Sequence, residues 1–253
     1  RIFDLEHLVS EWVNKNRLVW GTHARLDEAA DIKSSENSSL ELNSPLRVNS
    51  MYNAGCRYIG FGAESASPRM LELMGKGGSM LRHGVEKVFG FDVPVTMMVG
   101  IKNTIEAGIH ANCTWIMGYP GETLDDLKAT VAFIKWQEDV LMERYRKNSR
   151  FWSLASEAIN KNMFVATAYP GTEMFNDPQV RKALSDGFGI KYHNGKPLCD
   201  SSLESYVEQL NDATDLIRTL DGSLLQYSKM ADSLFLEIRD ILNNGDIFDI
   251  LDL

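Results

Sequence analysis

Polar residues and glycines follow four short apolar segments of this chain, and these residues are the best suited to do chemistry. Each segment has the near-continuous apolar character of a buried strand, and a helix-like pattern comes after it. Because ligands of parallel α/β proteins bind at the carboxyl ends of strands, the polar residues there are candidates for a binding site. In chain order they are Thr22, His23 and Arg25; Glu64 and Ser65; Gly118, Tyr119 and Glu122; and Tyr169 with Thr172.

Each candidate also has a plain structural interpretation. Glu64 would be costly at the end of a buried strand unless it is paired, so it could cap the next helix or pair with Arg25. His23 is equally well explained as a hydrogen-bonded structural histidine. The two Tyr-Pro-Gly segments, residues 119–121 and 169–171, are equally well explained as ordinary turns in loops. The sequence contains no Ser/His/Asp, zinc or nucleotide-binding fingerprint. Catalytic residues and metal ligands therefore stay unassigned.

Strands and helices alternate along the part of the chain that would hold these residues. The apolar runs predict strands over residues 17–25, 57–65, 109–117 and 162–168, and Gly60 and Gly62 inside the second indicate a close approach of ligand or backbone. Helices are predicted over residues 5–14, 46–54, 68–74, 95–106 and 124–137, the last with a capping box of Thr123 and Asp126. Residues 33–44 are predicted to form a loop and residues 75–94 an insertion.

This alternation predicts an α/β fold with a parallel sheet wrapped in helices. We expect residues 1–180 to form a partial (βα) barrel of the TIM type, although four strands cannot close a barrel and periodicity does not distinguish a barrel from an open sheet. Residues 181–253 are expected to be a mainly helical extension, with two helices over 202–243 broken at Asp221 and Gly222. The last residues, 245–253, are predicted either to fray or to dock on a protein partner.

The bulk composition is that of an ordinary globular protein and excludes several classes. The chain has 253 residues, of which 44% are hydrophobic and 24% charged, with a formal charge of −9. That charge argues against a nucleic-acid partner, and no apolar run approaches the length of a membrane span. Three widely spaced cysteines, Cys56, Cys113 and Cys199, indicate neither a disulfide framework nor a metal site, so we expect a cytoplasmic protein.

Four stretches, taken in order, resemble consecutive pieces of the radical S-adenosylmethionine (SAM) superfamily. They are WGTHARLD (20–27), AGCRYIGFGAESAS (54–67) followed by MLELMGKG, AGIHANCTWIMGYPGETLDDL (107–127), and AYPGTEMF (168–175). The branch they are most similar to often carries a cobalamin-binding domain. The resemblance covers roughly residues 1–180.

The resemblance implies a partial barrel that holds SAM and a [4Fe–4S] cluster, with cobalamin left open. By position, Arg25 would lie near SAM, while Glu64 and Ser65 would reach its ribose or amino-acid portion. The stretch from Ile116 through Gly118 and Tyr119 to Glu122 would surround adenine, and Tyr169, Gly171 and Thr172 would add backbone contacts. The implied activity is that of an oxidoreductase or transferase: reductive SAM cleavage to a 5′-deoxyadenosyl radical, or methyl transfer. Its partners would be an electron donor and a small-molecule or peptide substrate.

The departure from this superfamily is the absence of its CxxxCxxC cluster motif. Family order would place that motif before Arg1, so we expect further sequence upstream and cluster ligands outside this segment. The alternatives are a non-catalytic scaffold or interaction subunit derived from the same fold, and an ordinary α/β-barrel lyase or aldolase. The third would call for a Schiff-base lysine or a metal cluster at the strand ends, and the sequence offers neither.

Overall fold

A computed structural model of the chain describes residues 18–33, 40–146, 159–210 and 216–253. The helix predicted over residues 5–14 lies outside these ranges. The chain divides into two compact units, each described by itself below. Unit 1 comprises residues 1–115, 128–162 and 247–253, and unit 2 comprises residues 116–127 and 163–246. Because the units interleave along the chain, the domain boundary near residue 180 stays a prediction.

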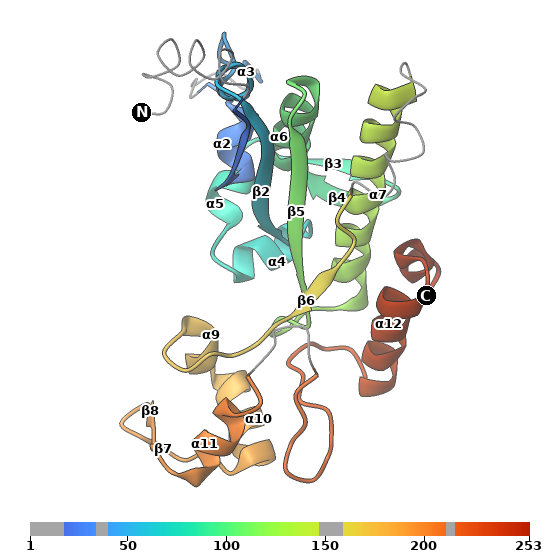
Figure 1. The fold of residues 1–253 in the computed structure, drawn as a ribbon. Helices are drawn as coiled ribbons and strands as arrows, with labels where there is room; N and C mark the ends of the chain where they lie inside the picture. Colours follow the sequence, from blue (N-terminus) through green and yellow to red (C-terminus); the bar gives the residue numbers. More distant parts are fainter. Residues whose placement is uncertain (1–17, 34–39, 147–158, 211–215) are drawn as a thin grey trace. The chain divides into compact units, whose positions relative to one another are not determined.

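Four strands form the main sheet, in the order β1-β2-β5-β6 (Figure 1). They are β1 (Trp20–Ala24), β2 (Cys56–Glu64), β5 (His110–Met117) and β6 (Met163–Val165), which confirms the four predicted strands. β1 pairs with β2, and β2 with β5, in parallel. The α/β class with a parallel sheet is therefore confirmed, and the partial barrel stays a prediction.

The buried face of the sheet in unit 1 comes from alternating residues, as the pleat of a strand requires. In β5, Ala111, Cys113 and Trp115 are buried, and residues between them are partly exposed. The helix α7 (Leu124–Arg146) covers this face: Gln137 Nε2 donates to Ala111 O at 3.1 Å, and the Trp115 ring lies edge-on to Phe133, 5.7 Å away. One face of β5 is thereby fixed as core.

The opposite face of the sheet carries polar and aromatic side chains. Tyr58 stacks on His110 with ring centroids 5.6 Å apart, and Asn112 Nδ2 donates to the Tyr58 hydroxyl at 2.8 Å. Burial lowers the pKa of His110. A Cβ on Gly60 would lie 2.5 Å from His23 Nδ1, so the glycine makes room for the histidine ring. The close approach predicted at Gly60 is made by a side chain of the same chain.

Short helices and a hairpin complete unit 1. The helices are α2 (Leu26–Ala30), α3 (Arg47–Asn53), α4 (Pro68–Leu73), α5 (Gly77–Met80) and α6 (Val95–Glu106). Residues 75–94, predicted as an insertion, contain α5 and an antiparallel hairpin of β3 (Val85–Val88) and β4 (Phe91–Pro94). Phe89 and Gly90, both with positive φ, make its two-residue turn, a backbone shape suited to tight hairpins.

The N-terminus of α7 has the predicted capping box. Thr123 N–H donates to Asp126 Oδ2 at 2.9 Å, and Asp126 N–H donates to Thr123 Oγ1 at 3.4 Å. The helix is described through Arg146, so it extends beyond the end predicted near Gln137. The charged residues after Gln137 continue the same helix, and charged side chains are good helix formers.

Replacing Asp126 by alanine is expected to lower the free energy of unfolding by about 1–2 kcal/mol, because the N–H and the hydroxyl of Thr123 lose the carboxylate oxygen to which both donate. Asp125→Ala is the matched control: Asp125 lies in the same turn but is exposed, and its loss should cost under about 0.5 kcal/mol. Urea unfolding followed by circular dichroism measures both. Equal losses in the two variants would contradict the cap.

Unit 2 packs short helices around an aromatic core. Its elements are α9 (Glu173–Asn176), α10 (Pro178–Phe188), β7 (Tyr192–His193), β8 (Lys196–Pro197), α11 (Ser201–Val207) and α12 (Asp232–Asn244). Phe188 meets Tyr206 edge-on at 5.2 Å, and the Tyr206 hydroxyl donates to Ala168 O at 2.8 Å. This bond joins the core to the segment after β6.

The two predicted tail helices are shorter and farther apart than expected. Leu225 and Tyr227 are buried in the unit 2 core, yet they lie in residues 216–231, which form no helix. Leu225 N–H donates to Ile217 O at 2.9 Å. Arg218 and Leu224 form an isolated antiparallel β-bridge on either side of the turn at Asp221 and Gly222. The turn folds the segment back on itself, so apolar side chains reach the core without a helix.

The C-terminal residues pack on their own chain, in unit 1. Ile247 and Ile250 of the 3₁₀ helix η3 (Ile247–Asp252) are buried. The Phe248 ring lies 4.5 Å from Lys161 Nζ and 4.9 Å from Lys135 Nζ, within the range of cation–π attraction. The expectation that these residues fray was wrong, and docking on a protein partner stays a prediction. Among the described residues, no helix is both long and apolar enough to span a lipid bilayer.

Candidate functional site

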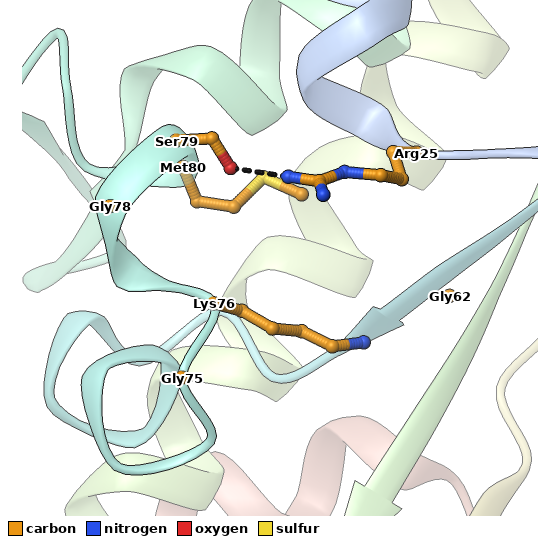
Figure 2. Close-up of a pocket in the computed structure, with 7 residues that line it drawn as sticks. All are labelled: Arg25, Gly62, Gly75, Lys76, Gly78, Ser79 and Met80. Atoms are coloured by element: carbon orange, nitrogen blue, oxygen red, sulfur yellow. Dashed lines mark hydrogen bonds between the residues drawn. The ribbon is translucent and has the colours of Figure 1, made fainter.

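A cavity of about 390 Å³ lies in unit 1 where β1 and β2 end, which is where the sequence places a ligand. Figure 2 shows Arg25 reaching from the end of β1 to Ser79, and Lys76 reaching from the loop before α5 toward the end of β2. The lining residues are Arg25, Gly62, Gly75, Lys76, Gly78, Ser79 and Met80.

Arg25 links the end of β1 to α5. Its Nε and Nη2 donate to the two carboxylate oxygens of Asp27 at 2.9 and 2.8 Å, and Nη2 also donates to Ser79 Oγ at 2.6 Å. The hydrogen bond and charge of Asp27 raise the pKa of Arg25. The side chain is still 63% exposed, so its remaining donors can reach a ligand.

Glu64 is held beside the cavity in an uncommon backbone conformation. Its φ is 63°, and the pairing with β5 shifts register between Gly62 and Glu64, as at a β-bulge. Such left-handed conformations cost a non-glycine residue about 1–3 kcal/mol and concentrate at functional sites. The carboxylate accepts from Lys76 Nζ at 2.7 Å. The pairing of Glu64 with Arg25 that the sequence left open is therefore wrong.

Glycines leave open space in and beside this cavity. A Cβ on Gly62 would lie 2.9 Å from Glu64 Oε1, so a side chain there would push the carboxylate away. Gly75, with φ of 69°, and Gly78 have no atom within 4 Å of their missing Cβ positions. Sequence reasoning missed Lys76 and Ser79 because it treated their segment as an insertion. The run Gly-Lys-Gly-Gly-Ser (75–79) was the signal available.

Ser65, the third residue of unit 1 that was predicted to bind SAM, makes structural hydrogen bonds instead. It is fully buried, 3.1 Å from Thr130 Oγ1, and its Oγ accepts from Ser67 N–H at 3.1 Å. Ala66 N–H also donates to Thr130 Oγ1, at 3.0 Å. In this geometry Ser65 fastens the turn between β2 and α4 to α7, and it does not line the cavity.

The other seven predicted residues lie in unit 2, around the ends of β5 and β6: Ile116, Gly118, Tyr119, Glu122, Tyr169, Gly171 and Thr172. Glu122 is fully buried, and its Oε2 accepts from Gly118 N–H at 2.5 Å. Gly118 has φ of 79°, and a Cβ on it would lie 2.9 Å from the Phe235 ring. Glu122 therefore closes its own loop, while Ile116 stays partly exposed at the end of β5.

The two Tyr-Pro-Gly turns follow β5 and β6, and Ala166 N–H donates to Met117 O at 2.8 Å. Burial, and then the negative charges of Asp177 and Glu173, raise the pKa of Tyr119, so the first turn lies within electrostatic reach of the helices after the second. Thr172 caps α9: its Oγ1 accepts from Phe175 N–H at 3.2 Å and donates to Tyr169 O at 2.7 Å. Tyr169 is 40% exposed, and Gly171 has open space around it.

The cysteines do not fit a [4Fe–4S] cluster. Cys56 and Cys113 are buried in different strands, Cys199 is exposed in unit 2, and burial raises the pKa of both strand thiols. No three His, Cys, Asp or Glu side chains gather into a metal-binding group among the residues described. No chemical step through a cluster is therefore derived for this chain.

The thiols are expected to differ sharply in reactivity. Cys199 should react with Ellman's reagent within seconds to minutes, whereas Cys56 and Cys113 should react only after denaturation, because burial keeps them protonated and inaccessible. Counting the thiols released before and after adding guanidinium measures this difference. In Cys199→Ser the fast phase should disappear; a fast phase that survives would contradict the burial of the other two.

No model of a known protein family matches the sequence. The chain is 27% identical over 163 residues to an uncharacterized methyltransferase of Pyrococcus horikoshii, a match covering 64% of this chain and 28% of that protein. The chain thus spans well under half the length of this relative.

Among solved structures, one is the radical SAM methyltransferase TsrM of Kitasatospora setae with tryptophan and a SAM analogue bound, at a TM-score of 0.49 and 15% identity over 98% of this chain and 40% of that one. TsrM with cobalamin and a [4Fe–4S] cluster gives 0.43 and 14%, over 90% and 37% of the chains. The cobalamin-dependent SAM radical enzyme OxsB gives 0.33 and 16%, over 90% and 28%. These TM-scores are too low to guide the assignment of residues in the site.

Proposed function

We propose that this chain is the SAM-binding part of a methyltransferase of the radical SAM type. The observation that carries the proposal is the cavity at the carboxyl ends of β1 and β2, with its two ion pairs, Arg25–Asp27 and Lys76–Glu64. The four sequence stretches that resemble the superfamily support it. So does the methyltransferase relative, as far as methyl transfer is concerned.

The charges around the cavity fit the amino-acid end of SAM. That end is a zwitterion, with one carboxylate and one ammonium group. Arg25 and Lys76 line the cavity and offer donors to a carboxylate. Glu64 is not a lining residue, but it lies beside the cavity as the partner of Lys76 and would offer an acceptor to an ammonium group. Gly75 and Gly78 leave open space beside them, so a ligand can approach the backbone closely.

The work that falls to this chain is binding and orientation. SAM itself would supply the transferable methyl group or the adenosyl radical. Arg25 and Lys76 would hold the amino-acid end of SAM in place. Glu64, with its strained backbone conformation, would set the orientation of that end. An orientation fixed in this way places the sulfonium relative to the acceptor. Cobalamin, the electron donor and the small-molecule or peptide substrate remain parts of the proposal that these residues leave open.

The experiment is equilibrium dialysis of the protein against radiolabelled SAM, without any cluster or reductant. We expect saturable binding in the micromolar range, about −8 kcal/mol, a common strength for a small ligand in a preformed site. S-adenosylhomocysteine should compete, and adenosine, which lacks the amino-acid end, should compete much more weakly. If SAM does not bind, the proposal fails and a non-catalytic scaffold becomes the better interpretation.

A further inference from the structure

A second cavity in unit 1, of about 320 Å³, shares the wall formed by Gly78 and Ser79 with the first. Figure 2 shows these two residues from the side of the first cavity. The second cavity lies toward the start of α6, and its lining residues are Asp27, Ile32, Gly78, Ser79, Arg82, His83 and Thr96. Neither the sequence motifs nor the proposed SAM site uses Arg82, His83 or Thr96.

The buried side chain of Thr96 is the feature that indicates a bound ligand. It is only 2% exposed, yet among the described residues its hydroxyl has no hydrogen-bond partner. An unsatisfied buried hydroxyl is costly, and native proteins normally pair such groups. Thr96 lines the cavity, and a rotation of its buried side chain would bring the hydroxyl to a group bound there, which could accept the missing hydrogen bond.

The position of Thr96 in its helix favours an anion. It is the second residue of the 12-residue helix α6, and Pro94, the residue before that helix, provides no side-chain cap. The N-terminus of a helix carries a partial positive charge and N–H donors that suit an oxyanion. The Thr96 hydroxyl and the N-terminus of α6 are therefore both suited to bind an anion.

Arg82 adds positive charge beside Thr96. Arg82 and His83 line the cavity, and neither side chain makes a hydrogen bond or ion pair with any residue that the structure describes. The opposing charge in the lining is Asp27, and both of its oxygens already accept from Arg25. A guanidinium without an acidic partner is well suited to bind phosphate or carboxylate through two hydrogen bonds.

We propose that this second cavity binds an oxyanion of the phosphate class, held by the Thr96 hydroxyl, the start of α6 and the side chains of Arg82 and His83. The anion is either free phosphate or a phosphate group carried by a larger ligand. The inference goes beyond the proposed function and does not depend on it, since the three residues lie outside the SAM cavity.

The test is calorimetric titration of the protein with inorganic phosphate and, separately, with phenyl phosphate, at constant ionic strength and without SAM. Saturable binding of either probe is expected. Tighter binding of phenyl phosphate would assign the site to a phosphorylated ligand, and tighter binding of inorganic phosphate to the free ion. If neither binds, the proposal is overturned, whatever the result for SAM.

Three variants tie binding to this cavity. Thr96→Val keeps the shape but removes the hydroxyl, and Arg82→Gln removes the charge; each should raise the dissociation constant about tenfold or more, the effect of losing one hydrogen bond to a charged group. Lys87→Gln is the matched control, because Lys87 is an exposed cation of the nearby hairpin, paired with Asp92, and should change nothing. Equal weakening in all three variants would mean nonspecific charge attraction and overturn the site.

The unfolding temperature of each variant shows whether a loss of phosphate binding comes from the missing group or from a folding defect. Thr96→Val should unfold at the same or a higher temperature than the parent in phosphate-free buffer, because it removes an unsatisfied buried hydroxyl. Added phosphate should raise the unfolding temperature of the parent and of Thr96→Ser by more than that of Thr96→Val. An equal phosphate-induced rise in all three proteins would overturn the role of the hydroxyl.

Discussion

Replacing Lys76 by methionine is expected to weaken SAM binding by about 10- to 100-fold. Methionine keeps much of the length of the side chain but removes its charge, and a hydrogen bond to a charged group contributes about 1.5–3 kcal/mol. The loss has a second cause. Glu64 accepts from Lys76 Nζ at 2.7 Å, so removing the lysine leaves its carboxylate uncompensated beside the ligand's own carboxylate. Equilibrium dialysis with labelled SAM measures the change.

Two other variants make this result specific to the cavity. Lys87→Met removes a lysine of the β3–β4 hairpin whose side chain is 66% exposed, so SAM binding should stay within twofold of the parent. Arg25→Met should weaken binding in the same direction as Lys76→Met, because Arg25 lines the same cavity. Unchanged binding in both cavity variants, with SAM still bound, would place the SAM site elsewhere.

Trp115→Ala is expected to be the most destabilising of the substitutions considered, lowering the free energy of unfolding by about 3–5 kcal/mol. The Trp115 side chain is fully buried in β5 and lies edge-on to Phe133 of α7. Its removal leaves a large void under β5, the strand that ends at Met117. Denaturant unfolding, monitored by circular dichroism, gives the value.

Trp115→Phe separates packing from polarity at the same position. The indole Nε1 has no hydrogen-bond partner among the described residues, so replacing the ring by phenylalanine also removes a buried donor that nothing satisfies. We therefore expect a loss of only about 1–2 kcal/mol. Leu73→Ala, at a 51% exposed position of α4, should cost under about 0.5 kcal/mol. A loss for Trp115→Phe as large as that for Trp115→Ala would contradict this account.

The sequence by itself determined the elements whose signals are local. A buried strand is a short apolar run, and a helix start is marked by residues that satisfy its own free N–H groups. Ser67, the residue before the helix predicted over 68–74, caps α4, since its side chain accepts from Met70 N–H, and α6 has the predicted bounds. Arg25, predicted at the end of β1, lines a cavity, whereas Glu64 and Ser65, predicted at the end of β2, are not among its lining residues.

Only the tertiary structure decided which side chains meet. Glu64 pairs with Lys76, 12 residues away, because a bulge at the end of β2 turns its carboxylate toward the loop before α5. Ser65 faces Thr130 rather than the cavity, because that same turn packs against α7. The unsatisfied hydroxyl of Thr96 has no trace in the sequence either, since it depends on what the rest of the chain leaves uncovered. Local patterns set the elements, whereas register, bulges and packing between distant segments set the chemistry, because those contacts depend on residues far apart along the chain.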